Sequence, residues 1–316
     1  MKEWIAALLC LAAAGTAYGQ AYPSKPVKVV VPFAPGGGAD IAARGFVTKL
    51  QQALGQPFVI DNRGGAGSLI GTEVVAKAPP DGYTILITSD SFAASAATHK
   101  PAFDPMNSLV PVVELGSAPF GLTVHPSVPA NSVAEFIALA KTKPGVFSYG
   151  SSGTGGLTHL ITEMFSDMAG IKMVHVPYKS TGGATPDLLS GVFQVYVGNV
   201  SPLLPYIQAG RLKLLGVTNA KRWPLLPEVP TIGETVKGFA ADPWFGLFVP
   251  KGTPPEIVKR LNEVVNKIQA EEDVKKYFAT QGMQPVGGTS VEFGKLVRED
   301  YMRWIRIVDK IGFKPD

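Results

Sequence analysis

From residue 27 onward, short runs of β-branched residues alternate with stretches that have the apolar period of a helix, and this alternation restricts the fold more than any other feature. The first three runs predict strands at 27–33, 57–62 and 83–89, with helices at 40–55 and 68–78 between them. The first strand, VKVVVPF, is almost continuously apolar, as expected of a strand that is covered on both faces. The repeat therefore predicts a parallel sheet with helices on both faces, which is an α/β fold.

A second α/β series follows a long extended segment at 110–125, and another extended segment, PWFGLFVP at 243–250, ends that series. Two extended crossings between two α/β series predict two lobes joined by a two-strand hinge. We therefore expect two mainly parallel sheets. Lobe 1 is predicted to comprise residues 20–120 and 241–316, with lobe 2 inserted as residues 121–240.

The first 19 residues have the pattern of an export signal. A positively charged start at Lys2 precedes the apolar stretch IAALLCLAAAG, which is shorter than the roughly 20 residues of a membrane-spanning helix. The small residues Ala17 and Gly19 place cleavage between Gly19 and Gln20. Cys10, the only cysteine, lies inside this signal, so the mature chain would have no disulfide, thiolate nucleophile or cysteine metal site. We expect a soluble protein in the periplasm.

Composition and motifs exclude several functional classes. The net charge of +4 comes from scattered Lys and Arg, which is not the clustered basic pattern of a nucleic-acid-binding surface. The turn PGGGAD does not fit G-x-G-x-x-G, no turn is followed by G-K-[ST], and GSSGTG lacks the G-x-S-x-G spacing. The four histidines are far apart and form no H-E-x-x-H motif. We therefore expect no cofactor, no metal site and no nucleic-acid partner.

Three glycine-rich turns follow predicted strands and lead into helices: PFAPGGGAD, DNRGGAGS and YGSSGTGGLTH. Ligands of open α/β sheets bind beyond the carboxyl ends of the strands, where these turns lie. Glycine allows the backbone to approach a ligand, and the free N–H groups of a first helical turn favour an anion. A single turn of this kind is also ordinary βα geometry. Three of them together predict a site for a carboxylate or phosphate.

Individual side chains near these turns have two interpretations each. Asp40 is better explained as a helix cap than as an acid catalyst, and Arg63 is better explained as a brace against an acidic neighbour than as a ligand for the anion. His159 either reaches the cleft or packs within its helix, and both interpretations stay open. Aromatic residues near strand ends, such as Phe33 and Trp244, usually pack in the hydrophobic core, although one or two of them would line a pocket.

Six stretches carry a resemblance to a known family: YPSKPVKVVVPFAPGGGADIAAR, VIDNRGGAGSLIGTEVVAKAPPDGYTILI, FSYGSSGTGGLTHLITEMF, VHVPYKSTGGATPDLLSG, QAGRLKLLGVTNAKRWPLLPEVPTI and WFGLFVPKGTPPEIVKRLN. Over nearly the whole mature chain, the sequence resembles the solute receptors of tripartite tricarboxylate transporters, the Bug family of periplasmic binding proteins. The resemblance implies a two-lobed Venus flytrap fold and a monomeric binding protein, not an enzyme. Such a protein captures a small carboxylate and delivers it to a two-component integral membrane permease.

The resemblance also implies a set of ligand-binding residues, because the family holds carboxylates largely with backbone amides, hydroxyls and bridging water. Together with the pocket-wall interpretation of Trp244, the predicted set is Phe33, Ala34, Gly37, Gly38, Asn62, Gly65, Ala66, Ser89, Asp90, Ser91, Ser151, Ser152, Gly153, Thr154, His159, Asn199 and Trp244.

The chain departs from many relatives in ways that bear on the ligand. It has Gln194 and Gly198 where many relatives carry acidic residues, and Ser180 where many carry glycine. Fewer acids near the cleft disfavour a ligand with an amino group. Lys179 would suit a second carboxylate if it faced inward, but a solvated surface lysine is the simpler interpretation. With aromatic residues nearby, these departures favour an aromatic or dicarboxylic acid such as terephthalate.

Two other functions fit the same residues. An exported serine hydrolase would use Ser151 or Ser152 with His159, although no third group that would orient the histidine is identifiable. A ligand-sensing subunit would present its closed form to a signalling kinase, and it would use the same lobe closure as a transport receptor.

Overall fold

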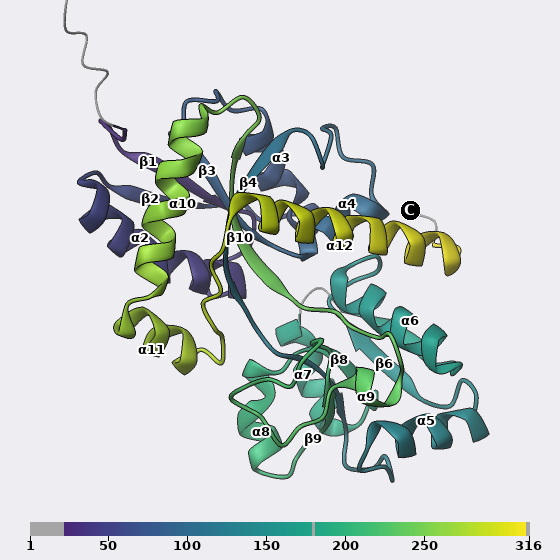
Figure 1. The fold of residues 1–316 in the computed structure, drawn as a ribbon. Coiled ribbons are helices and arrows are strands. Elements are labelled where there is room, and N and C mark those ends of the chain that lie inside the picture. The colour runs from purple at the N-terminus through teal and green to yellow at the C-terminus, as the bar shows by residue number, and fades with distance from the viewer. Residues whose placement is uncertain (1–21, 179–180, 314–316) are drawn as a thin grey trace, which may run out of the picture.

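The computed structural model describes residues 22–178 and 181–313, and the predicted export signal, Cys10, Lys179 and Ser180 lie outside the described residues. Two five-stranded sheets form the centres of two lobes (Figure 1). In lobe 1 the strand order is β2-β1-β3-β10-β4, and in lobe 2 it is β7-β6-β8-β5-β9. The strands are β1 (Val27–Val31), β2 (Phe58–Asn62), β3 (Thr84–Ser89), β4 (Leu109–Ser117), β5 (Phe120–Val124), β6 (Ser148–Ser151), β7 (Val174–Pro177), β8 (Val195–Asn199), β9 (Lys213–Val217) and β10 (Trp244–Pro250).

Each sheet is mixed, and the predicted two-lobed α/β fold is confirmed. In lobe 1, β10 pairs antiparallel with both β3 and β4, while β1 pairs parallel with β2 and β3. In lobe 2, β5 takes the same place and pairs antiparallel with both β8 and β9. One strand in each sheet therefore runs antiparallel to the other four.

The strand directions follow from the crossing between β4 and β5. Because β4 ends at Ser117 and β5 begins at Phe120, the carboxyl end of β4 lies where the chain passes between lobes. The strands β1, β2 and β3 run in the same direction as β4, so they end on the side facing lobe 2. The strand β8 runs against β5, and Asn199 at its carboxyl end pairs with Phe120. The turns after the parallel strands of both lobes thus face each other.

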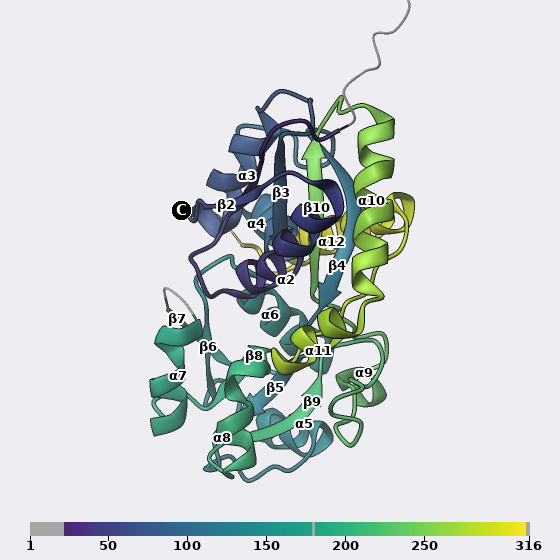
Figure 2. The same cartoon turned by 90° about the vertical axis from the view of Figure 1, so that its left-hand side faces the viewer.

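Helices cover both faces of the lobe 1 sheet, as the alternating strand pattern requires. In β1, Val29 and Val31 pack into one core with residues of α2 and α10, whereas Val30 packs into the other with residues of α3, α4 and α12. Figure 2 shows these helices around the lobe 1 sheet. The helices of lobe 1 are α2 (Gly38–Leu54), α3 (Leu69–Ala76), α4 (Ser91–Thr98), α10 (Pro255–Gln269), α11 (Glu272–Thr280) and α12 (Ser290–Lys310). Those of lobe 2 are α5 (Val133–Thr142), α6 (Leu157–Ala169), α7 (Thr181–Ser190), α8 (Leu204–Gln208) and α9 (Ile232–Thr235).

Hydrogen bonds fix the segments that connect the lobes. The Ser117 hydroxyl donates to the Pro243 carbonyl over 2.6 Å, and the Thr218 hydroxyl donates to the Ala241 carbonyl over 2.8 Å. Ser117 also exchanges two backbone hydrogen bonds of 2.9 Å with Gln284, which ties the segment after α11 to the first crossing. The assignment of the lobe limits to residues 120 and 241 stays a prediction. Within 22–178 and 181–313, none of the helices has both the length and the apolar character that crossing a membrane requires.

The centre of lobe 1 offers a test of the packing between β10 and α12. Gly246 of β10 lies against the Phe293 ring, where an added Cβ would be 1.9 Å from Cζ. We expect Gly246→Ala to lower the free energy of unfolding by about 1–3 kcal/mol, because the ring has to move within a packed core. The measurement is chemical denaturation of the purified protein.

The matched control is Gly294→Ala, one residue after that ring in α12. A Cβ there would meet only the Pro111 Cγ atom at 3.6 Å, an ordinary contact distance. Since glycine in a helix interior costs up to about 1 kcal/mol relative to alanine, this control should be neutral or stabilising. Equal losses in both variants would contradict the described packing.

Candidate ligand-binding site

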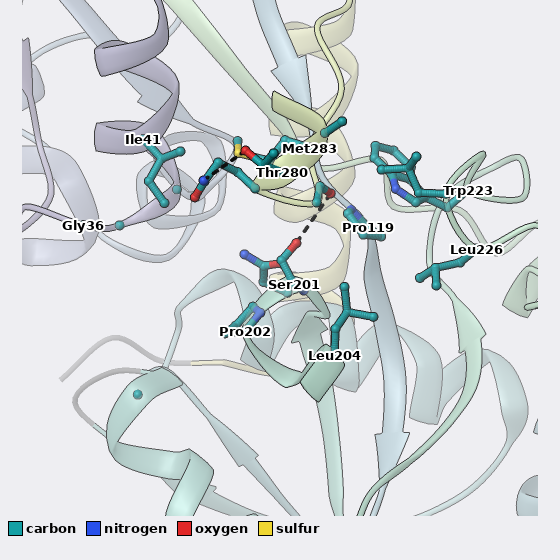
Figure 3. A pocket seen from close by; sticks show the side chains of 18 of the residues that line it. Gly36, Ile41, Pro119, Ser201, Pro202, Leu204, Trp223, Leu226, Thr280 and Met283 are labelled. Atoms are coloured by element: carbon teal, nitrogen blue, oxygen red, sulfur yellow. Dashed lines mark hydrogen bonds between the residues drawn. The ribbon is translucent and has the colours of Figure 1, made fainter. Parts of the chain in front are cut away.

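A cavity of about 740 Å³ lies between the lobes (Figure 3). Lobe 1 contributes the start of α2 and the end of α11 with the turn after it. Lobe 2 contributes the segment after β8, part of α7 and the loop before α9, and Pro119 lies at the first crossing. The lining residues are Gly36, Gly37, Gly38, Ile41, Pro119, Gly182, Thr185, Asn199, Ser201, Pro202, Leu204, Trp223, Leu225, Leu226, Ala279, Thr280, Gln281, Gly282 and Met283.

A buried carboxylate shapes the glycine turn that opens α2. Asp40 accepts from the Gly36 N–H over 2.9 Å, from Arg44 Nε over 2.8 Å and from Asn62 Nδ2 over 3.0 Å. Burial alone would raise the pKa of the Asp40 carboxyl, but these three donors together hold that pKa below its usual value. The expected helix cap is therefore wrong. The helix begins at Gly38 with Gly37 as its N-cap, and Asp40 instead holds the preceding turn in shape.

The first helical turn of α2 keeps free donors beside the cavity. Within the described chain, the backbone N–H groups of Gly38 and Ala39 have no hydrogen-bond acceptor, as expected at a helix start. The helix dipole adds a partial positive charge at the same place. Gly37 and Gly38 line the cavity, so this end of it suits an anion.

The second glycine turn is strained and does not line the cavity. Gly65, Gly67 and the non-glycine residues Ala66 and Ser68 all have positive φ, with Ser68 at 88°. Ser68 stands at the N-cap position of α3, but its hydroxyl is buried and bonds to none of the described residues. Asn62 reaches the first turn instead, through its bond to Asp40.

The interpretation of Arg63 as a brace is confirmed. Arg63 Nε donates to Asp61 Oδ2 over 2.8 Å, so the guanidinium pairs with its acidic neighbour two residues earlier. The cation therefore supports the second turn and does not line the cavity.

The third glycine turn uses most of its donors internally. The backbone N–H of Ser152 donates to the Thr158 hydroxyl over 2.8 Å, that of Gly153 to the Ser151 hydroxyl over 3.1 Å, and that of Gly155 to His159 Nδ1 over 3.0 Å. The lining of the cavity does not include the predicted residues of this turn, which are Ser151, Ser152, Gly153, Thr154 and His159. In this structure the side chains at the start of α6 organise the turn, and their predicted ligand contacts stay predictions.

Two stacked imidazoles lie behind this turn. The rings of His159 and His175 are 4.0 Å apart between centroids and nearly parallel, and Tyr149 stacks on His175. The Ser151 hydroxyl lies 2.6 Å from His175 Nε2. Burial lowers the pKa of His159 to about 4, and burial followed by the neighbouring His159 lowers that of His175 to about 4, against the opposing effect of Glu163.

The serine–histidine pairing expected for a hydrolase is not present. His159 accepts a backbone N–H through Nδ1, and the Ser152 hydroxyl bonds to Thr158. His175 contacts Ser151 instead, but Ser151 is fully buried. Of the two interpretations of His159, the structure supports packing, because the ring stacks on His175 and also meets the Phe313 ring edge-on at 6.0 Å.

Four predicted site residues lie beneath the crossings and do not line the cavity. The Trp244 indole is fully buried, and its Nε1 donates to Asp300 Oδ2 over 2.6 Å. Ser89 ends β3 and Ser91 begins α4, and between them the backbone N–H of Asp90 donates to the Trp244 carbonyl over 3.1 Å. Burial, followed by the nearby charge of Asp300, raises the pKa of Asp90 well above its usual value. Trp244 is therefore core, and this structure gives no support to its role as a pocket wall.

Among the predicted residues, the structure brings Gly37, Gly38 and Asn199 together around the cavity. The other predicted residues of the first and second turns do not line it; these are Phe33, Ala34, Asn62, Gly65 and Ala66. Sequence reasoning missed the rest of the wall, above all the loop with Trp223 and the turn after α11. The sequence offered no clear signal there: Gly282 turns the chain sharply after α11, but its φ of 67° is known only from the structure.

The part of the cavity wall that the structure describes is uncharged and has a polar and an apolar part. None of its described lining side chains is Lys, Arg, Asp or Glu. The polar part includes the α2 amides, Asn199 and Thr280, while Trp223 and Met283 belong to the apolar part. Ser201 of lobe 2 donates to the Gly282 carbonyl of lobe 1 over 3.5 Å, a long bond that bridges the two lobes (Figure 3). An anion here would be held by N–H and hydroxyl donors.

The family model described as the tripartite tricarboxylate transporter family receptor, TctC, matches residues 42–313. The chain belongs to this family. It is 36% identical to Protein BugT of Bordetella pertussis over 297 residues, which span 93% of this chain and 91% of BugT. The resemblance to Bug-type receptors is thereby confirmed.

Solved structures of periplasmic binding proteins share the fold. The structure of R. palustris Rpa4515 with adipate superimposes with a TM-score of 0.82 at 35% identity, covering 93% of this chain and all of that one. MatC from Rhodopseudomonas palustris with bound malate has a TM-score of 0.78 at 29% identity and covers 91% of this chain and all of its own. This TctC-family receptor therefore has the two-lobed fold of a small-carboxylate binding protein.

The stacked histidines predict a dependence of stability on pH. Both pKa values lie below the value of about 6.5 for an unfolded histidine, so the unfolded chain binds more protons as the pH falls from about 6.5 towards 4. Their contribution to stability is therefore complete above pH 6.5 and is lost towards pH 4. We expect the melting temperature to fall less over this interval in a His159→Asn/His175→Asn double variant than in the wild type.

The control for this measurement is His125→Asn. That ring bonds to Ser127 on lobe 2, away from the stack, so the variant should keep the wild-type pH dependence. Carboxylates titrate in all three proteins, and the comparison removes their effect. Identical pH profiles for the double variant and the wild type would show that the stacked pair is not the group being titrated.

Proposed function

We propose that this TctC-family receptor captures a small carboxylate between its lobes and delivers it to the two-component integral membrane permease of a tripartite tricarboxylate transporter. The observation that carries the proposal is the interlobe cavity, in which free α2 amides face a polar wall from the opposite lobe. Export to the periplasm, with cleavage between Gly19 and Gln20, is part of the same proposal.

Capture works through closure of the lobes. A ligand populates the closed form only to the extent that it binds that form better. Both lobes line the cavity, so closure adds contacts from lobe 2 to an acid already held by α2. As water leaves, each hydrogen bond to the carboxylate becomes stronger because the local dielectric constant falls. The closed, loaded form is then the species that the permease recognises.

The ligand is proposed to be an aromatic or dicarboxylic acid, of which terephthalate is one example. The apolar wall that contains Ile41, Trp223 and Met283 suits a ring or a carbon chain. Rpa4515 with adipate and MatC with bound malate, both similar to this chain, support a dicarboxylate.

We propose binding without a covalent step. A nucleophilic serine has to reach its substrate, and Ser151, which contacts His175, is fully buried. Incubation with ester and amide substrates tests this proposal. Turnover that is abolished by Ser151→Ala or Ser152→Ala would establish a hydrolase instead.

A thermal-shift screen of mono- and dicarboxylates, including adipate, malate and terephthalate, tests the proposed ligand class. A ligand that binds only the folded state at 100 times its dissociation constant adds about 2.7 kcal/mol to stability. We expect at least one acid to raise the melting temperature, with the dissociation constant then measured by calorimetry. Matched amides or alcohols serve as controls, and equal shifts with them would contradict recognition of a carboxylate.

The first glycine turn is tested by Gly37→Ala and Gly37→Val. A Cβ at Gly37 would lie 3.4 Å from the Ala34 carbonyl oxygen, so the turn accommodates it while the added atoms enter the cavity. We expect affinity for the acid found in the screen to fall about threefold with alanine and at least tenfold with valine, because the anion can no longer approach the α2 amides. The melting temperature without ligand should stay close to that of the wild type. Unchanged affinity in the valine variant would place the carboxylate elsewhere.

A further inference from the structure

A second cavity of about 480 Å³ adjoins the first. The two share three lining residues: Leu225 from the lobe 2 loop, and Ala279 and Met283 from the end of α11 in lobe 1. The second cavity extends from these residues along α10 and α11 to the segment that follows Met283. Its lining residues are Leu225, Asn266, Gln269, Ala270, Lys275, Ala279, Met283, Gln284, Pro285 and Val286.

The shared residues are apolar and come from both lobes, and they lie at the boundary between the two cavities. Met283 is buried and its backbone N–H donates to the Phe278 carbonyl over 2.9 Å, which fixes this side to α11. The side chain of Leu225 is about half exposed, on a loop between β9 and α9. Closing the lobes around a ligand would bring these two sides together.

We propose that the binding cleft has two chambers and takes an elongated acid, with one carboxylate at α2 and an anionic or polar distal end in the second cavity. This inference rests on the proposed function and specifies its ligand class. The apolar body of the acid passes between Leu225 on one side and Ala279 and Met283 on the other. An ammonium group and three side-chain amides line the far chamber, and none of its lining side chains within the described chain is a carboxylate.

Lys275 is the cation available to a distal carboxylate. Its Nζ lies 2.7 Å from Glu272 Oε1, and both side chains are substantially exposed. A pair this exposed contributes little to stability, so the lysine can turn to a ligand at small cost. The amides of Asn266 and Gln269 already bond to backbone carbonyls, so they shape the chamber.

Size agrees with an elongated ligand. Sites for small ligands commonly have volumes of about 300–1,000 Å³, and the first cavity alone lies in the upper part of this range. A four-carbon diacid bound at α2 would leave the apolar boundary between the cavities uncovered. A chain of about ten carbons would cover it and bury the exposed apolar surface of Leu225.

The experiment compares butanedioate, decanedioate and decanoate in calorimetric titrations of the mature protein. Ala279→Leu adds bulk at this boundary from an exposed helix position, and Ala53→Leu at an exposed position of α2 is the matched control. We expect Ala279→Leu to weaken decanedioate at least tenfold and butanedioate less than twofold, with no change in Ala53→Leu. Lys275→Gln should weaken decanedioate about five- to tenfold and leave decanoate within twofold.

The outcomes separate this inference from the proposed function. If no acid of any length, including those of the screen, binds the wild type, both are overturned. If short acids bind and decanedioate does not, or if Ala279→Leu affects all acids equally or none, the two-chamber cleft is wrong and the proposed receptor function stands. If Ala279→Leu discriminates by length but Lys275→Gln weakens decanedioate and decanoate equally, the distal carboxylate site at Lys275 is wrong.

Discussion

The whole arrangement depends on the two places where the chain passes between the lobes. Once β4 ends at Ser117 and β5 begins at Phe120, the parallel strands of both sheets must end at the shared boundary. Turns after those strands then face each other, and hydrogen bonds from Thr98 to the Gly155 carbonyl and from Ser201 to the Gly282 carbonyl join the lobes there. The hydrogen bonds from Ser117 and Thr218 to the returning segment keep the crossings together. A ligand site between the lobes is thus a consequence of strand direction.

At a glycine turn between the lobes, a backbone N–H either donates a hydrogen bond within the protein or is free to donate one to a ligand. In the α2 turn, Asp40 takes the N–H of Gly36 and fixes the loop, while those of Gly38 and Ala39 stay free. In the α6 turn, hydroxyls and an imidazole from the following helix take the donors themselves. The two turns look alike in sequence because both supply glycine before a helix. They differ in how many loop donors nearby side chains take: Asp40 takes that of Gly36 in the α2 turn, whereas side chains take those of Ser152, Gly153 and Gly155 in the α6 turn.

This competition between internal and ligand hydrogen bonds limited how much of the fold and the site could be predicted from the sequence. Periodicity and glycine turns predicted both α/β series and the two extended crossings, since these signals are local, but they did not predict α4, α9 or α11. Of the site, Gly37, Gly38 and Asn199 were predicted from strand ends and from the family resemblance. The wall at Trp223 and at the end of α11 could not be predicted, because it depends on contacts such as Ser201 with Gly282, 81 residues apart. Trp244 illustrates the reverse error: its position at a strand end suggested a pocket, but its indole bonds to buried Asp300.

The described lining of the first cavity has no charged side chain, and this affects how an acid would be held. A lysine or arginine would attract a carboxylate even in the open form, where water surrounds it. Amide and hydroxyl donors compete poorly with water until the lobes close, because a hydrogen bond gains strength only as its surroundings lose dielectric screening. The affinity for the acid then depends directly on closure of the lobes. A receptor built in this way holds its acid firmly only when closed, which is the form that a permease has to distinguish from the empty protein.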